Sequence, residues 1–222
     1  MKVSIDSNVF SLFPDLEIFG LALFNLNLSS IENQPIKEFY KPNLEESERV
    51  VKIWKETYKM FPTDKQARAS INYLTKASHD NKLRKINPLV DIYNEASLLS
   101  LAPFGGEDIN LLKSSLKIGL AKGNEPFLPL GKEKVENPKE GEVVYLDGEN
   151  KVVCRSLNWL ESDLHKITEH TKNVIFVSEK PLNSLPSSNI GMDFLFNKLK
   201  DCCSSYNRFI LDKNKPSIEF NN

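Results

Sequence analysis

Polar side chains that could do chemistry gather in two segments that lie far apart in the sequence. The candidates in the first segment are Asn87, Asp91, Asn94, Phe104, Gly105, Gly106 and Glu107. The candidates in the second are Arg155, Asn158, Trp159, Glu161 and Asp163. If the segments face each other, they form a concave site with carboxylates, amides and an aromatic wall. Such a site can bind an amino-acid or nucleoside group and hold a water molecule.

The first segment is predicted to be a helix followed by a glycine turn. Asn87 is a good N-cap, and Pro88 suits the first helical position, where no donor is missed. Asp91 and Asn94 share one face of this helix, where they could line the site or simply brace the helix. Residues 103–106 read Pro-Phe-Gly-Gly, which predicts a turn whose glycines allow positive φ and close approach of a ligand or another strand. We expect the turn to form one wall, with a carboxylate rim at Glu107.

A basic stretch precedes this helix. Its cations are Arg68, Lys76, Lys82, Arg84 and Lys85. Runs of charged residues are usually exposed to solvent, so one interpretation is that this stretch is a solvated segment after the end of a helix. The other is an edge that contacts RNA phosphates, because backbone contacts need only a few basic residues.

Composition restricts the class of protein. The formal net charge is -1, which argues against a basic coat for non-specific binding to duplex DNA. The three cysteines fit neither a zinc spacing nor a disulfide framework, so we expect reduced thiols in the cytoplasm. No apolar run approaches the ~20 residues of a membrane span, and we expect a soluble protein.

Known catalytic fingerprints and cofactor motifs are not found in the sequence. It contains no Walker loop, no G-x-G-x-x-G, no G-x-S-x-G and no H-E-x-x-H. His165 and His170 lie five apart among carboxylates, a spacing that neither helix nor strand brings together cleanly. We therefore expect no metal and no cofactor, with the two histidines in a solvated loop.

The hydrophobic pattern predicts one mixed α/β domain, residues 1–222, with a helical first half and a β-rich second half. Helices are expected at 43–60, 65–76, from 87 to the glycine turn, and from 184–188 to 203. Strands are expected at 2–6, 16–29, 116–120, 143–146, 151–155, 173–177 and 207–211, with a hairpin at 147–148. The polar tail at 213–222 is expected to fray.

Three stretches of sequence carry a family resemblance. They are INPLVDIYNEASLLSLAPFGGED, LAKGNEPFLPLGKEKVENPKEGEVVYLDGENKVVC and RSLNWLESDLHKITEHTKNVIFVSE. With the helical lead-in RASINYLTKA, the chain over residues 68–179 resembles a stand-alone B3/B4 domain of the bacterial phenylalanyl-tRNA synthetase beta chain. The resemblance implies a mixed α+β fold with one pocket. It also implies an editing activity, the hydrolysis of tyrosine wrongly esterified to phenylalanine tRNA.

The resemblance also implies roles for particular residues. The editing glutamate of the family, placed by counting back from Thr171, falls on Asp163, with Glu161 as the alternative. That carboxylate would orient the substrate ammonium group or the water, and backbone N–H groups of Gly105 and Gly106 would receive the oxyanion. Asn158 would hold the pocket, and Arg155 would meet the terminal phosphate or ribose.

Three functions remain open at this stage. The first is a hydrolase that clears a mischarged tRNA in trans, and a preformed pocket of amino-acid size would support it. The second is a non-catalytic tRNA- or RNA-binding module, which is favoured because Gly105 stands where the family has a histidine. The third is a domain that binds a free amino acid or small metabolite. The expected partner is the aminoacylated 3′ end of tRNA, with no DNA or membrane, and no aminoacylation is expected.

Overall fold

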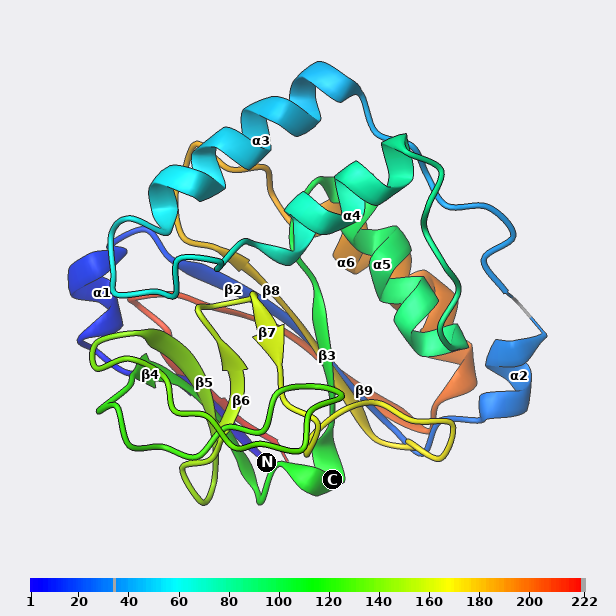
Figure 1. The fold of residues 1–222 in the computed structure, drawn as a ribbon. Coiled ribbons are helices and arrows are strands. Elements are labelled where there is room, and N and C mark those ends of the chain that lie inside the picture. Colours follow the sequence, from blue (N-terminus) through cyan, green and yellow to red (C-terminus); the bar gives the residue numbers. More distant parts are fainter. Residues whose placement is uncertain (34, 221–222) are drawn as a thin grey trace.

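The computed structural model describes residues 1–33 and 35–220, and the strands of this part of the chain form two sheets (Figure 1). The larger sheet has the order β10-β1-β4-β5-β6-β7, and the smaller has the order β3-β8-β2-β9. The strands are β1 (Lys2–Ile5), β2 (Glu17–Phe24), β3 (Gly105–Asp108), β4 (Ser115–Leu120), β5 (Val143–Asp147), β6 (Val152–Arg155), β7 (Leu160–Glu161), β8 (Val174–Lys180), β9 (Ser205–Leu211) and β10 (Ser217–Glu219). Pairing is antiparallel except between β1 and β4.

The longer helices lie on one side and across one end of the sheets (Figure 1). The helices are α1 (Val9–Leu12), α2 (Leu28–Glu32), α3 (Leu44–Thr57), α4 (Ser70–His79), α5 (Pro88–Ser100), η1 (Ile109–Leu111), α6 (Asn189–Leu199) and η2 (Lys200–Cys202). No helix in the described ranges is long and apolar enough to cross a membrane.

Strand β2 is buried on both faces, which explains its continuous apolar sequence. Ile18 and Ala22 face the core between the two sheets, which also receives Ile118 from β4. Leu21 and Leu23 point to the opposite face, where they join the core beneath α5 and α6. The domain is therefore layered as large sheet, small sheet and helices.

The outer face of the larger sheet is covered by the irregular segment 121–142. Phe127 of this segment is fully buried against Val144, Leu146 and Val152. This cover lets β5 and β6 bury both faces, so polar groups on these strands need partners inside the protein.

Several sequence-based expectations about the elements are confirmed, and others are wrong. Helix α5 begins as predicted, with the Asn87 side chain accepting from the backbone N–H of Val90 at 3.0 Å. Helix α4 begins at Ser70 instead of Lys65. The carboxylate of Asp64 accepts from the backbone N–H of Gln66, which closes a local turn in place of the first turn of the predicted helix. The predicted frayed tail contains β10, which pairs with β1.

The predicted helical first half and β-rich second half agree with the described elements, because five of the six α-helices precede residue 101 and eight of the ten strands follow residue 104. The two halves do not form separate layers. The early strands β1 and β2 sit inside sheets built largely from later residues, and α6 packs beside α5. Elements from both ends of the chain therefore build the same layers.

Candidate active site between the two sheets

A polar cavity lies between the two sheets, and we call it the inter-sheet cavity. It is lined by Gly105, Glu107, Leu116, Tyr145, Val153, Cys154, Leu157, Asn158, Glu161, Val177 and Glu179. Its free volume is about 10 Å³, which is the space of about one water molecule. A preformed pocket of amino-acid size between the two polar segments, which the hydrolase hypothesis favoured, is therefore not present here.

Glu107 and Glu161 form a buried carboxyl pair in this cavity. Burial raises the pKa of Glu107 well above its usual range, and the neighbouring Glu161 adds to this rise. Burial also raises the pKa of Glu161, while hydrogen bonds from Glu107 and Cys154 oppose the shift. Two carboxyl groups share a hydrogen bond only if one of them is protonated, and the raised pKa of both groups favours a pair that holds one proton.

One oxygen of Glu161 lacks any partner. Its Oε2 atom is buried and makes no hydrogen bond with the residues that the structure describes. A buried carboxylate oxygen normally has a partner, because an unsatisfied one is costly. Oε2 is therefore the atom that a water molecule or a substrate N–H or O–H in the cavity would satisfy.

Glu179 joins the two sheets through its side chain. Its Oε1 atom accepts from the Tyr145 hydroxyl at 2.5 Å, and its Oε2 atom accepts from Asn158 Nδ2 at 3.0 Å. Burial raises the pKa of Glu179 to about 7, although both of these hydrogen bonds lower it. The cavity thus holds a third carboxyl group, Glu179, which changes charge near neutral pH.

Asn158 is held by an unusual backbone turn. The two preceding residues, Ser156 and Leu157, have φ of 48° and 64°, a region that residues with a Cβ seldom occupy. The backbone N–H of Ser70 donates to the Asn158 carbonyl at 3.2 Å, and Tyr58 donates to the Ser156 carbonyl at 2.8 Å. The ends of α3 and α4 therefore brace the turn that presents Asn158 to the cavity.

The predicted glycine turn is a strand. Gly105 and Gly106 belong to β3 and pair with Val177 and Phe176 of β8, and neither has a positive φ. Glycine is needed for close packing instead, because a Cβ on Gly106 would lie 2.9 Å from the Phe176 ring. A Cβ on Gly105 would lie 3.2 Å from Glu161 Oε1, inside the cavity. The prediction of a turn was wrong, while the prediction of close approach was correct.

The structure brings together members of both predicted segments. Gly105 and Glu107 from the first segment meet Asn158 and Glu161 from the second in the inter-sheet cavity. The remaining predicted site residues do not line it, and these are Asn87, Asp91, Asn94, Phe104, Gly106, Arg155, Trp159 and Asp163.

Residues of helix α5 that were expected in the site serve the helix and the core. Asn87 is the N-cap, and Asp91 Oδ1 accepts from the backbone N–H of Ile86 at 2.9 Å. Asn94 is buried on α5, and Phe104 belongs to the core beneath α5 and α6. The bracing interpretation of Asp91 fits these contacts.

Arg155 is fully occupied by an internal ion pair. Its guanidinium donates to both carboxylate oxygens of Glu142, at 3.0 and 2.9 Å, and both side chains are buried. It also stacks 5.3 Å from the centre of the half-buried Trp159 ring. These two predicted substrate-binding residues therefore stabilise each other and the 142–159 region.

Asp163 lies outside the cavity although it is only two residues from Glu161. Its carboxylate accepts from the backbone N–H of Gly131 at 3.0 Å and pairs with Lys166 at 2.9 Å. These contacts lower the pKa of Asp163. Of the two alternatives for the key carboxylate, Glu161 is the one that faces the cavity.

Three cavity residues with polar or thiol side chains were not predicted from the sequence, and these are Glu179, Tyr145 and Cys154. Glu179 lies beyond the predicted strand end at residue 177, whereas β8 continues to Lys180. The available signal was the charge itself, because a strand buried on both faces normally has an apolar residue at such a position. Tyr145 and Cys154 looked like ordinary strand residues, so no signal distinguished them.

His165 was expected in a solvated loop, and this was wrong. Its ring is buried, with Nε2 lying 3.2 Å from Asp147 Oδ2. Burial lowers the pKa of His165, while Asp147 raises it. In the ranges that the structure describes, no group of three or more histidine, cysteine or acidic residues could hold a metal ion.

The predicted RNA-binding cations separate into two places. Arg68 and Lys76 line hollows between α3 and α4. Lys82, Arg84 and Lys85 follow α4, and Lys82 pairs with Asp80 at 3.5 Å. The basic run of the sequence is therefore not one continuous surface.

Comparison with known proteins identifies the family. The model of the B3/4 domain family matches residues 53–183, which is more than half of the chain. The chain belongs to the B3/4 domain family. The matched range includes all the lining residues of the inter-sheet cavity. The predicted mixed α/β fold and the resemblance to this domain are confirmed.

One solved structure with a similar fold is an N-terminal fragment of the phenylalanyl-tRNA synthetase beta-subunit from Pyrococcus horikoshii. The two are 12% identical with a TM-score of 0.49, and the match covers 99% of this chain and 54% of the fragment. The chain thus spans about half the length of that structure. A search of curated proteins found no match.

Proposed function

We propose that this B3/4 protein binds tRNA and hydrolyses a mischarged aminoacyl ester in trans, without any aminoacylation activity of its own. The observation that carries the proposal is the unsatisfied Oε2 atom of Glu161 in the inter-sheet cavity. A buried carboxylate with a free acceptor atom beside a space for one water is what activation of water requires.

The reaction adds the hydroxyl of water to the ester carbonyl carbon. The bond between that carbon and the ribose oxygen breaks, and the remaining proton of water goes to the ribose oxygen. An aminoacyl ester is already reactive, so positioning the water and stabilising the oxyanion supply much of the acceleration. Of the two predicted oxyanion donors, Gly105 lines the cavity and Gly106 does not, so the backbone N–H of Gly105 is the donor that we propose.

Glu161 has the central role in this proposal. It accepts from the attacking water or from the substrate ammonium group, and the raised pKa of a buried carboxylate makes it a better base near neutral pH. Glu107, paired with Glu161, keeps that carboxylate oriented, and Asn158 and Glu179 supply polar contacts to the amino acid. Asp163, Arg155 and Trp159 have no direct part.

The closed cavity favours one alternative function. With about 10 Å³ of free space, an amino-acid side chain enters only if the surrounding strands move apart. Strand β7 has two residues and lies at an edge of the larger sheet, so it is the element that can move with least loss of pairing. A protein that keeps this cavity closed would bind tRNA without chemistry.

The test is the loss of aminoacyl-tRNA over time with the purified protein. Tyrosine on phenylalanine tRNA and a panel of other mispaired tRNAs are the substrates. Glu161→Gln keeps the size and shape of the side chain and removes its negative charge, so we expect the rate of hydrolysis to fall at least a hundredfold. Asp163→Asn is the matched control, with the same chemical change two residues away, and it should keep activity within threefold.

Two results would contradict the proposal. Equal loss in Asp163→Asn and Glu161→Gln would remove the assignment to Glu161. No hydrolysis of any mispaired tRNA by the wild-type protein, with tRNA still bound, would establish the binding module instead.

A further inference from the structure

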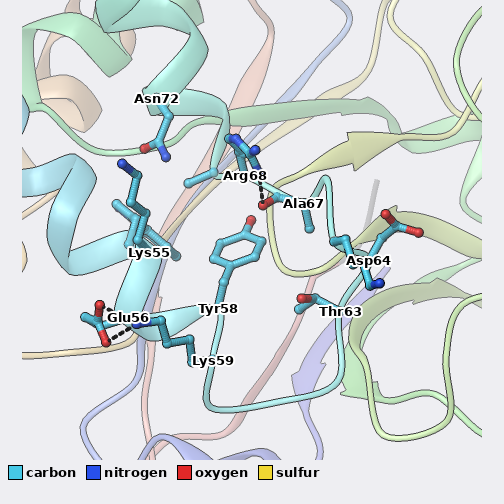
Figure 2. Close-up of a pocket in the computed structure, with 12 residues that line it drawn as sticks. Lys55, Glu56, Tyr58, Lys59, Thr63, Asp64, Ala67, Arg68 and Asn72 are labelled. Carbon is cyan, nitrogen blue, oxygen red and sulfur yellow. Dashed lines mark hydrogen bonds and ion pairs between the residues drawn. The ribbon is translucent and has the colours of Figure 1, made fainter.

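A groove runs between α3 and α4, outside the inter-sheet cavity. It consists of two hollows of about 470 and 620 Å³ that share Lys55, Arg68 and Asn72. We call it the α3–α4 groove and define it by Lys52, Lys55, Arg68, Asn72, Thr75 and Lys76. In Figure 2, Lys55 from α3 and Arg68 and Asn72 from the α4 side border the same hollow.

The cations of this groove lack acidic partners. Lys52, Lys55, Arg68 and Lys76 are exposed, and none lies within 4.0 Å of a carboxylate in the described part of the chain. By contrast, Lys59 at the groove edge is neutralised by Glu56 at 2.7 Å. The two hollows are lined by six cations and by four carboxylates, Glu48, Glu56, Asp64 and Asp80, so their net charge is +2. Arg68 also donates to the backbone carbonyls of Gln66 and Ala67, which holds its guanidinium at the groove. This concave surface is therefore a locally positive field that attracts an anion, although the whole chain carries a net charge of -1.

Two helices supply these charges from opposite sides. Lys52 and Lys55 lie three residues apart on α3, so they share a face of that helix. Lys76 extends from α4, and Arg68 precedes that helix. A linear anion lying between the helices can meet cations along both of its sides, whereas a small anion can meet only a few of them.

The floor of the groove is polar and incompletely satisfied. Trp54 Nε1 and Asn72 Oδ1 are buried and have no hydrogen-bond partner among residues 1–33 and 35–220. Both residues line the smaller hollow. A buried donor and a buried acceptor without partners need a water molecule or a ligand atom to satisfy them, and both lie beside the cationic groove.

One end of the groove adjoins the inter-sheet cavity. Tyr58 lines the groove, and its hydroxyl donates to the Ser156 carbonyl at 2.8 Å. Ser70 at the start of α4 donates to the carbonyl of Asn158, whose side chain in turn donates to Glu179 in the cavity. A strand in the groove would therefore have its end at the turn that presents Asn158.

We infer that the α3–α4 groove binds the sugar-phosphate backbone of one RNA strand, the strand whose end carries the aminoacyl group. This rests on the proposed function. Phosphate oxygens neutralise Lys52, Lys55, Arg68 and Lys76. The hydrogen bonds from Tyr58 and Ser70 to the 156–158 turn place one end of the groove next to the cavity, which the strand end enters when the cavity opens. Lys82, Arg84 and Lys85 lie outside this path and make no essential contact.

The experiment measures the Kd for an uncharged phenylalanine tRNA transcript over a range of salt concentrations. The double variant Lys52→Gln/Lys55→Gln removes two groove charges, and Lys82→Gln/Lys85→Gln removes two charges outside it. All four residues are exposed, and circular dichroism checks that both variants fold. The groove variant should bind at least tenfold more weakly, with a salt slope smaller by about one to two units. The control should stay within twofold.

Three outcomes would overturn the inference. They are undetectable tRNA binding by the wild-type protein, an equal or larger loss in the control variant, and displacement of tRNA by inorganic phosphate at an ionic strength where chloride does not displace it. The last outcome would indicate a site for a small anion only. Loss of the proposed hydrolysis is separable, because Glu161→Gln leaves the groove intact and should bind tRNA with unchanged affinity.

Discussion

The hydroxyl of Tyr145 donates to Glu179 Oε1 at 2.5 Å and so connects the larger sheet to the smaller one. Tyr145→Phe would leave this buried oxygen without its donor. An unsatisfied buried acceptor costs about 1–3 kcal/mol, so the free energy of unfolding should fall by about that amount. Urea denaturation measures it. Tyr206→Phe removes an exposed hydroxyl and should change stability by less than about 0.5 kcal/mol.

Glu179 should make the protein less stable as pH rises. Its pKa is raised from 4.5 to about 7 in the folded protein, so the folded state binds more protons than the unfolded state between these values. Its contribution is fully present below pH 4.5 and is lost as pH rises through about 7. The loss is on the order of 3 kcal/mol, at 1.36 kcal/mol per pKa unit.

Urea denaturation at a series of pH values from 5 to 8 tests this prediction. Glu179→Gln cannot titrate, so its stability should decline less over that range than that of the wild type. A parallel decline in both proteins would show that Glu179 is not the group responsible.

His165 should make the protein less stable as pH falls, the opposite direction to Glu179. Burial lowers its pKa below 6.5, so the unfolded chain takes up a proton that the folded state resists. Its contribution is present above pH 6.5 and is lost as pH falls through the folded-state pKa. In a comparison from pH 7 to 5, His165→Gln should therefore lose less stability than the wild type. The exposed His170→Gln is the control and should follow the wild type.

Gly106 should not tolerate a methyl group. In Gly106→Ala the new Cβ would lie 2.8 Å from Ile167 Cδ1 and 2.9 Å from the Phe176 ring. Overpacking of this kind costs about 1–3 kcal/mol, which thermal denaturation would detect as a lower Tm. Gly105→Ala meets its nearest atom at 3.2 Å, the flexible Glu161 carboxylate, and should cost less. If the two variants were equally stable, the close packing of β3 against β8 would be wrong.

Local sequence signals predicted the elements whose formation depends on neighbouring residues. The Asn87 cap and Pro88 fixed the start of α5, and Asp147-Gly148 marked the connection between β5 and β6. The apolar run of β2 announced a strand buried on both faces. For the cap and the hairpin the deciding interactions lie within one element or one turn, and for β2 the composition of the segment itself was sufficient.

The site itself depends on contacts between distant residues, and there the sequence was less informative. Asp163 was the first candidate for the family glutamate and Glu161 the alternative, yet β7 ends at Glu161 and the chain then turns outward, so only Glu161 lines the cavity. Glu179 became a site residue only because Tyr145 and Asn158 reach it from another sheet. Nothing local marked Arg155 as the partner of Glu142, thirteen residues earlier. The proposed roles of the cavity residues remain predictions.

The position of β2 has a consequence for how the protein forms during synthesis. This early strand lies between β8 and β9, and both of these partners come from the last quarter of the chain. While the ribosome is still translating the middle of the sequence, the apolar residues of β2 have no strand to pair with. Such long-range pairing slows folding, and until the pairing forms the apolar segment of β2 is exposed and prone to aggregation. The nascent chain is therefore expected to need shielding until its final strands emerge.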